Sequence, residues 1–157
     1  MTQTTVPQRG ELAPEHTWDT ASVFASDADW EAEYARIEGE LPELERFQGR
    51  LGQSPDLLAE YLGTAEQLLN AAQRVYLYGS MLNNTNTADQ AASALHDRGV
   101  GLLTRAYTAC AFAEPEILAI GQATLREWMA AEPRLAIYAH RFDEIERNRP
   151  HVRSAEV

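Results

Sequence analysis

The sequence has 157 residues, 45% of them hydrophobic, and a net charge of -11 at pH 7, and every one of its 13 basic residues is arginine. This length and apolar content suffice for one folded domain with a core, which excludes a compositionally disordered chain. The acidic balance argues against partners such as nucleic acid or an anionic membrane, because both bind basic surfaces.

The single cysteine and the first residues narrow the class of protein further, because they exclude several kinds of site and targeting signal. Cys110 is alone, so neither an internal disulfide nor a cysteine-based zinc site can form. It lies on an apolar stripe, where we expect a buried and inert thiol. The N-terminus has no apolar run typical of a secretion signal, and no stretch approaches the roughly 20 apolar residues of a membrane span. We therefore expect a cytoplasmic protein.

The chain begins with a predicted arm, residues 1–25. Residues 1–16 are polar and without periodicity, which predicts extended backbone laid on a surface. Asp19 is a suitable cap for one short helical turn. We expect Trp18 to anchor this turn in the core, together with Val23 or Phe24.

A first helix is predicted from Ser26, which is a favourable N-cap with aspartates following in the first turn. Pro42 lies inside the apolar pattern of this helix and should kink it or restart it nearby, because proline lacks the N–H that the helix needs. Gly49 and Gly52 bracket the exit. The apolar face consists of Trp30, Tyr34, Ile37, Leu41, Leu44 and Phe47.

Two long helices, over residues 55–82 and 88–112, form the centre of the predicted fold. Ser54 is a favourable cap for the first, and Thr87 with Gln90 fits a capping box for the second. Their short polar link predicts an antiparallel hairpin. The apolar stripes are Leu58, Leu62, Ala65, Leu69, Ala72 and Tyr76 on the first helix, and Ala91, Leu95, Leu102, Ala106 and Cys110 on the second.

Two segments of the hairpin raise specific expectations. The large residues of segment 76–79 cannot all face one way, so we expect neighbours on more than one side. Gly99 and Gly101 weaken the second helix by about 1 kcal/mol each relative to alanine. They either admit a closely packed neighbouring helix or mark local fraying, and the sequence leaves both open.

The rest of the chain predicts short helices over residues 116–120 and 124–131, then a last helix over 134–148. No segment alternates like a strand. The predicted fold is all-α, an antiparallel helical bundle built on the long hairpin. Residues 26–149 form the helical domain, and the polar residues 150–157 start a connection to a catalytic domain absent from this chain. The inward positions of the last helix are Leu135, Tyr138, Phe142 and Ile145.

No catalytic constellation is visible in the residues. His140 and Glu144 lie one helical turn apart, but two residues do not make a metal site without a third ligand. A phosphate-binding glycine loop and a nucleophile elbow are both absent from the sequence. We therefore expect no catalytic, cofactor-binding or metal-ligating residue in this chain.

Several segments in order resemble the opening of oligoendopeptidase F, a family of the thimet-like zinc metallopeptidases. The resemblance runs the length of the chain. It is carried by Val6-Pro7-Gln8-Arg9, Trp18-Asp19, Val23-Phe24, Ser26-Asp27-x-x-Trp30, Phe47-x-Gly49-x-Leu51-Gly52, Tyr76-Leu77-Tyr78, residues 84–87, Phe112-x-x-Pro115-Glu116-Ile117-Leu118 and Arg149-Pro150-His151.

The resemblance implies a larger, mostly helical enzyme that cleaves short peptides in the cytoplasm. Its zinc is held by a His-Glu-x-x-His helix and a downstream glutamate. No position here matches these residues, so no cofactor is expected in this chain and zinc is implied for the parent enzyme. The implied partners are the C-terminal catalytic domain of the same protein and, in the full enzyme, short peptides. The implied role of this lobe is to wall or cap the substrate channel. Tyr76, Tyr78 and Tyr107 are candidate peptide contacts, although core packing is the simpler expectation for each.

Two other hypotheses remain open at this stage. The first is a free-standing helical module for protein interaction or oligomerisation, without enzymatic activity, which uses an apolar helix face wider than one hairpin partner covers. The second is a small helical metalloprotein that binds metal through His140 and Glu144.

Overall fold

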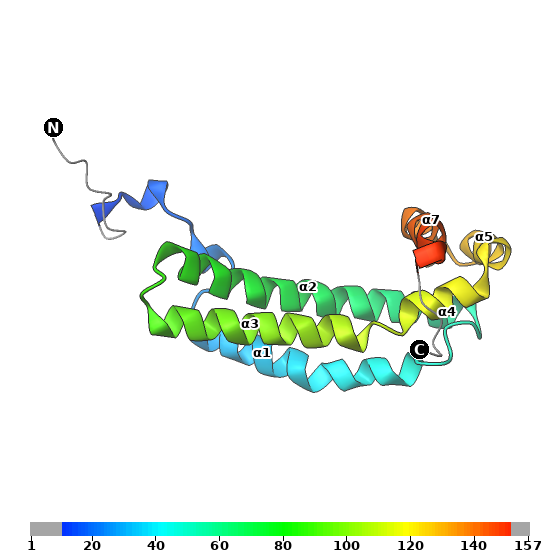
Figure 1. Ribbon diagram of the computed structural model, residues 1–157, viewed down its shortest axis with the longest axis horizontal. Helices are drawn as coiled ribbons and strands as arrows, with labels where there is room; N and C mark the ends of the chain where they lie inside the picture. The colour runs from blue at the N-terminus through cyan, green and yellow to red at the C-terminus, as the bar shows by residue number, and fades with distance from the viewer. Residues whose placement is uncertain (1–10, 152–157) are drawn as a thin grey trace. The chain divides into compact units, whose positions relative to one another are not determined.

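The computed structural model describes residues 11–151, and these contain helices and no strand (Figure 1). The all-α prediction is confirmed. The parts of the expected arm and connection at residues 1–10 and 152–157 lie outside the described residues. The 3-10 helices are η2 (Pro14–His16), η3 (Thr20–Ser22), η4 (Leu41–Phe47) and η5 (Arg149–His151). The α-helices are α1 (Asp27–Glu40), α2 (Pro55–Thr85), α3 (Gln90–Ala109), α4 (Ala113–Ile120), α5 (Gln122–Ala131), α6 (Pro133–Ala136) and α7 (Ala139–Asn148).

The chain divides into two compact units. Unit 1 comprises Met1–Gly39 and Asn70–Arg105, and unit 2 comprises Glu40–Leu69 and Ala106–Val157. Helices α2 and α3 each contribute residues to both units. Within the described residues, no helix is long and apolar enough to cross a membrane.

In unit 1, the short turn before α1 is capped as predicted, but only one of its two predicted anchors is buried. The Asp19 carboxylate accepts a hydrogen bond from the Ser22 N–H at 3.3 Å. The prediction that Trp18 anchors in the core is wrong, because its side chain is 54% exposed. The predicted anchor Phe24 is buried, with its ring edge-on to that of Tyr78 at 5.6 Å.

Helix α1 begins as predicted and packs on α2 through a buried tryptophan. The Ser26 hydroxyl oxygen accepts from the Asp29 N–H at 3.2 Å, which satisfies one free amide of the first turn. Trp30 is fully buried, and its indole N–H donates to the Val75 carbonyl at 2.8 Å. A buried indole needs such a partner, so this bond fixes where α1 lies on α2 within unit 1.

Two ion pairs join α1 and α3 in the same register. Glu31 accepts from Arg98 at 2.5 and 2.7 Å, and seven residues later Glu38 accepts from Arg105 at 2.9 Å. Tyr34 lies between them, with the Arg98 guanidinium 4.5 Å from its ring centroid and its hydroxyl 3.0 Å from Arg105. Equal seven-residue steps in the same direction show that α1 and α3 run parallel.

The unit 1 parts of α2 and α3 form the predicted antiparallel hairpin, and two glycines set its closest approach (Figure 1). A Cβ at Gly79 would lie 2.8 Å from the His96 backbone, and a Cβ at Gly99 would lie 2.9 Å from the Tyr76 Cα. A Cβ at Gly101 would meet nothing within 4 Å. Close helix packing therefore accounts for Gly99, whereas no contact explains Gly101.

The link between α2 and α3 corrects the predicted cap. Helix α2 continues to Thr85, whose hydroxyl donates to the Leu82 carbonyl at 2.8 Å. Helix α3 is capped by Asp89, whose carboxylate accepts from the N–H groups of Ala91 and Ala92 at 2.9 and 3.2 Å. The Thr87 capping box is therefore wrong, because a carboxylate nearer the helix takes the free amides.

The apolar stripes of the hairpin are largely as predicted. On α3, Ala91 is exposed and the stripe runs instead through its neighbour Ala92. Segment 76–79 has neighbours on two sides, as expected: Tyr78 packs against Phe24, and Tyr76 against the His96 ring at 5.8 Å.

Unit 2 contains η4, the first half of α2 and helices α4 to α7. Pro42 lies in the first turn of η4, so the predicted restart of the helix at this proline is confirmed. The Ser54 hydroxyl oxygen accepts from the Leu57 N–H at 3.2 Å and caps α2 as expected. The buried apolar side chains of this unit are Leu41, Leu44, Phe47, Leu51, Leu58, Ala59, Tyr61, Leu62, Ala65, Leu68, Ala106, Ala113, Ile117, Leu118, Leu125, Leu135, Phe142 and Ile145.

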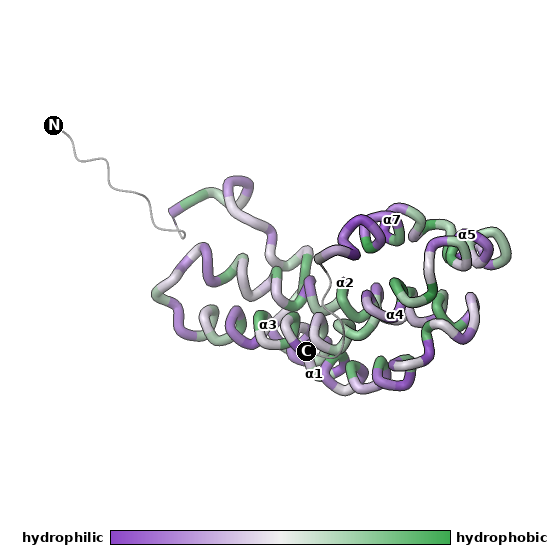
Figure 2. Tube along the Cα trace, turned by 45° about the vertical axis from the view of Figure 1, so that its right-hand side comes forward, coloured by the Kyte–Doolittle hydropathy of each residue, from purple (hydrophilic) through white to green (hydrophobic). Residues whose placement is uncertain are grey.

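The predicted last helix is in fact two helices, α6 and α7. The break is at Ile137, which is 77% exposed, and Tyr138, whose N–H bonds to the Leu135 carbonyl in a tighter turn. The Tyr138 hydroxyl donates to the Glu66 carboxylate at 2.6 Å, and its ring lies 6.5 Å from that of Phe142, so its side chain bridges the break between α6 and α7. Figure 2 shows hydrophilic residues along α7 interrupted by hydrophobic ones, which fits a helix with one buried face.

Candidate functional site

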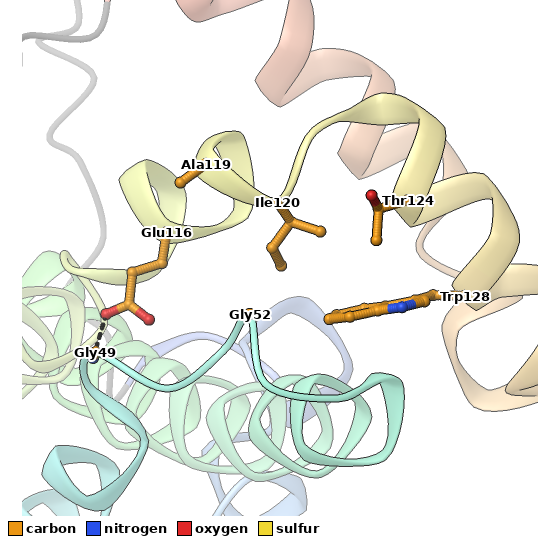
Figure 3. Close-up of a pocket in the computed structure, with 7 residues that line it drawn as sticks. All are labelled: Gly49, Gly52, Glu116, Ala119, Ile120, Thr124 and Trp128. Atoms are coloured by element: carbon orange, nitrogen blue, oxygen red, sulfur yellow. Dashed lines mark hydrogen bonds between the residues drawn. The ribbon is translucent and has the colours of Figure 1, made fainter.

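A hollow of about 470 Å³ in unit 2 is the main candidate site (Figure 3). Its walls come from the loop after η4 and from helices α4 and α5. The lining residues are Gly49, Gly52, Glu116, Ala119, Ile120, Thr124 and Trp128. We call it the Glu116 hollow.

Glu116 joins α4 to the loop after η4. Its carboxylate accepts from the Gly49 N–H at 2.6 Å and from the Leu51 N–H at 3.1 Å. Gly49 has a φ of 74°, a conformation in which a side chain would be strained. The two bonds tie α4 to a loop whose own backbone bonds are turns, from the Arg50 N–H to the Phe47 carbonyl at 3.0 Å and from the Gln53 N–H to the Arg50 carbonyl at 2.9 Å. They also bring together the two segments, 47–52 and 112–118, that carry part of the family resemblance.

Aromatic packing beneath the loop holds the same two segments together. The ring of Tyr61 on α2 lies 5.5 Å from that of Phe47 and 5.3 Å from that of Phe112. Tyr61 is 1% exposed, and burial raises the pKa of its phenol far above the usual range. Burial also raises the pKa of the half-buried Cys110 thiol, which keeps it protonated and unreactive at neutral pH. The sequence predicts a buried thiol here, whereas Cys110 is half-buried.

The other end of the hollow is apolar and aromatic. Figure 3 shows the Ile120 side chain pointing toward the space between Gly52 and the Trp128 ring, with Thr124 above that ring. A Cβ at Gly52 would lie 3.7 Å from Ile120 Cγ1, so only a very small residue leaves this space open. The hollow thus has a carboxylate at one end and an indole at the other.

A second hollow, of about 360 Å³, lies in unit 1 between the η3 segment and α2. Trp18 and Leu77 are the most exposed of its large apolar residues, at 54% and 43%. Its remaining lining is Asp19, Ser22, Ser80, Met81 and Asn84. Carboxylate, hydroxyl, amide and apolar groups share this surface, whose lining contains no basic side chain.

The three tyrosines singled out in the sequence have different environments. Tyr78 is buried and donates to the Asp27 carboxylate at 2.8 Å, and burial followed by this bond raises its pKa to about 12. Tyr76 is half-buried. Tyr107 is 58% exposed, so core packing is the wrong expectation for it. None of the three lines either hollow.

His140 and Glu144 approach each other as their spacing predicts, at 3.3 Å, but both are exposed on α7. Among residues 11–151, no three or more histidine, cysteine, aspartate or glutamate side chains are arranged to hold a metal ion. The described residues therefore do not fit the zinc that the family resemblance implies.

The sequence interpretation did not single out Glu116 or Trp128 as site residues. Glu116 appears in it only at a helix start and in a motif. The sequence signal that could have indicated this site is the pair Gly49 and Gly52 in one loop. Nothing in the sequence, however, places that loop beside α4.

Known proteins resemble this chain in both fold and sequence. The crystal structure of oligoendopeptidase-F from Enterococcus faecium superposes with a TM-score of 0.76 and 27% identity, covering 83% of this chain and 26% of that one. Oligopeptidase PepF of Bacillus subtilis is 32% identical over 149 residues, which is 95% of this chain and 22% of PepF. An oligoendopeptidase F homolog of Lactococcus lactis is 30% identical over 150 residues, or 93% of this chain and 24% of the homolog.

In these comparisons the chain is similar to the N-terminal part of proteins named as oligopeptidases, and its described residues are all-helical like that fold class. A family model described as Oligopeptidase F matches residues 116–157. The chain matches the N-terminal region of oligoendopeptidase F, so the resemblance found in the sequence is confirmed. It spans about a quarter of the length of these relatives.

Proposed function

We propose that the chain is the N-terminal helical lobe of an oligoendopeptidase F-like zinc metallopeptidase that cleaves short peptides in the cytoplasm. The observation that carries the proposal is the extent of the match, nearly all of this chain against about a quarter of each relative. In this proposal residues 26–149 form the helical domain, and residues 150–157 begin the connection to the catalytic part.

The lobe contributes walls, not chemistry. Zinc and the water that it activates belong to the remaining three quarters of the protein, because the described residues offer no ligand set. Buried aromatic packing and the Glu116 bonds make a rigid helical surface, which suits a wall or cap that limits the length of peptide entering a channel. Exclusion of bulk water and folded proteins would follow from such a wall.

The test has two measurements. An antibody raised against this chain should detect, in source cells, a polypeptide several times heavier than 17.5 kDa. That polypeptide should hydrolyse internally quenched peptides of about ten residues, lose activity with a zinc chelator, and discriminate against the same cleavable sequence attached to a folded protein. The isolated 157-residue chain serves as the inactive control. A native mass of 17.5 kDa, or peptide hydrolysis by the isolated chain after zinc is restored, would refute the proposal.

The alternative, a free-standing interaction module, draws support from the exposed apolar residues of the second hollow. This alternative requires that the native polypeptide has a mass of 17.5 kDa. It also requires that the chain associates with itself and that the substitution Leu77→Asp abolishes this association. Size-exclusion chromatography of the native and variant chains measures both.

A further inference from the structure

We propose that the Glu116 hollow binds a basic side chain, arginine or lysine, of a peptide. The choice of a peptide as the source rests on the proposed function, whereas the choice of a cation rests on the hollow itself.

The charge of Glu116 is the first reason. An ionised carboxylate has about four acceptor positions, and the amides of Gly49 and Leu51 take two of them. Among the described residues, no basic side chain pairs with Glu116, in contrast to Glu31 or Glu60, each of which pairs with an arginine. A half-buried carboxylate with free acceptor positions beside an open space favours a cationic ligand.

The opposite end of the hollow suits the rest of an arginine or lysine side chain. Both have a long apolar stem that packs along hydrophobic surface while the charged head stays polar. Ile120 and the ring of Trp128 offer that surface (Figure 3). An indole face also attracts a cation directly. The Trp128 ring can therefore contact the apolar stem or the charged head of the ligand side chain.

The size and floor of the hollow agree with this ligand. About 470 Å³ lies within the usual range for small-ligand pockets, roughly 300–1,000 Å³. Gly49 and Gly52 leave the floor without side chains, and no lysine or arginine lines the space. Anionic and purely apolar ligands are disfavoured, since neither can pair with the remaining acceptor positions of the Glu116 carboxylate.

Two capped peptides of nearly equal shape test the charge requirement, acetyl-Gly-Arg-Gly-amide and the same peptide with citrulline, whose side chain is neutral. Binding to the 157-residue chain is followed by the NMR signals of the Gly49 and Gly52 amides and of the Trp128 indole N–H. We expect saturable shifts with the arginine peptide and affinity at least tenfold weaker with citrulline. Equal affinities, or no saturable shift at these three groups, would overturn the proposal.

Two matched variants locate the site. Ala119→Arg places a cation on exposed α4 surface one turn from Glu116, where it competes for the carboxylate. Ala130→Arg adds the same charge on exposed α5 surface outside the lining. We expect Ala119→Arg to weaken the arginine peptide at least tenfold and Ala130→Arg less than threefold. Equal effects of the two variants would show general charge repulsion and would refute the site.

These measurements use the isolated chain, whereas the proposed function is tested by the mass and activity of the native polypeptide. A failure to bind the peptide would therefore leave the proposed function standing, and a native mass of 17.5 kDa would not by itself remove the cation site.

Discussion

The substitution Gly99→Ala tests the close packing of α2 and α3 most directly. A methyl group at this position would lie 2.9 Å from the Tyr76 Cα and 3.3 Å from the Val75 carbonyl oxygen. Both are backbone atoms, so the two helices must separate by about half an ångström to restore ordinary contact. Overpacking of this kind costs ~2–3 kcal/mol against a gain of ~1 kcal/mol in helix propensity. We expect a net loss of ~1–2 kcal/mol in the free energy of unfolding.

Gly101→Ala is the matched control, two residues along the same helix. Its methyl group would meet nothing within 4 Å, so only the propensity gain of ~0.5–1 kcal/mol remains. For a chain of this size, each kcal/mol shifts Tm by ~2–4 °C. Thermal and urea unfolding followed by circular dichroism should place Gly99→Ala below the native chain and Gly101→Ala above it. Equal stability of the two variants would refute the inferred helix contact.

Three further predictions concern charged and hydroxyl groups. Glu116→Ala removes two charge-assisted bonds to backbone amides, so the free energy of unfolding should fall by ~2–4 kcal/mol in urea denaturation, whereas the exposed Glu114→Ala should change it by less than ~0.5 kcal/mol. The pKa of Tyr78 is raised to about 12, so the folded protein holds the phenolic proton more tightly than the unfolded chain, and the contribution present below pH 10 is lost as pH rises through 12. Tyr78→Phe should therefore flatten the pH dependence of unfolding between pH 10 and 12, and an unchanged slope would contradict the assignment. A double-mutant cycle of Glu31→Gln and Arg98→Gln should give a coupling of ~0.5–1 kcal/mol that weakens in 1 M salt, because the Arg98 and Glu31 side chains are 42% and 49% exposed; a salt-independent value would argue against a solvent-accessible ion pair.

Helices and caps that depend on local chemistry could be predicted from the sequence. Ser26, Ser54 and Asp19 each accept the hydrogen bond that their position before a helical turn suggests. Pro42 divides the first helix where its missing N–H requires it. These features involve residues three or four apart, so the sequence contains all the information that determines them.

The sequence-based predictions were wrong where two residues could both cap a helix, or where tertiary contacts determined the local structure. Thr87 and Asp89 could both cap α3, and the carboxylate does so. A continuous helix over residues 134–148 has good periodicity, but the bond from Tyr138 to Glu66 accompanies a break that no local signal announces. Trp18 is exposed, although a large aromatic side chain is usually expected to anchor in the core.

The candidate site lay beyond sequence reasoning for the same physical cause. Glu116 binds amides 65 and 67 residues earlier in the chain, and no periodicity or spacing encodes that pairing. The resemblance had identified both partner segments, although without the contact between them. The absence of the His-Glu-x-x-His pattern was readable directly, since that motif is local.

The glycine contacts of the hairpin have a consequence for the link between its helices. Gly79 against His96 and Gly99 against Tyr76 lie three residues apart on each helix and in opposite directions, so together they fix the axial alignment of α2 and α3. The link at residues 86–89 therefore joins two helices whose alignment is set elsewhere. Loop closure becomes only slowly less favourable with length. Residues 86–88 of this link, ahead of the Asp89 cap, are accordingly a suitable place to insert a flexible tag or a reporter group without changing the hairpin.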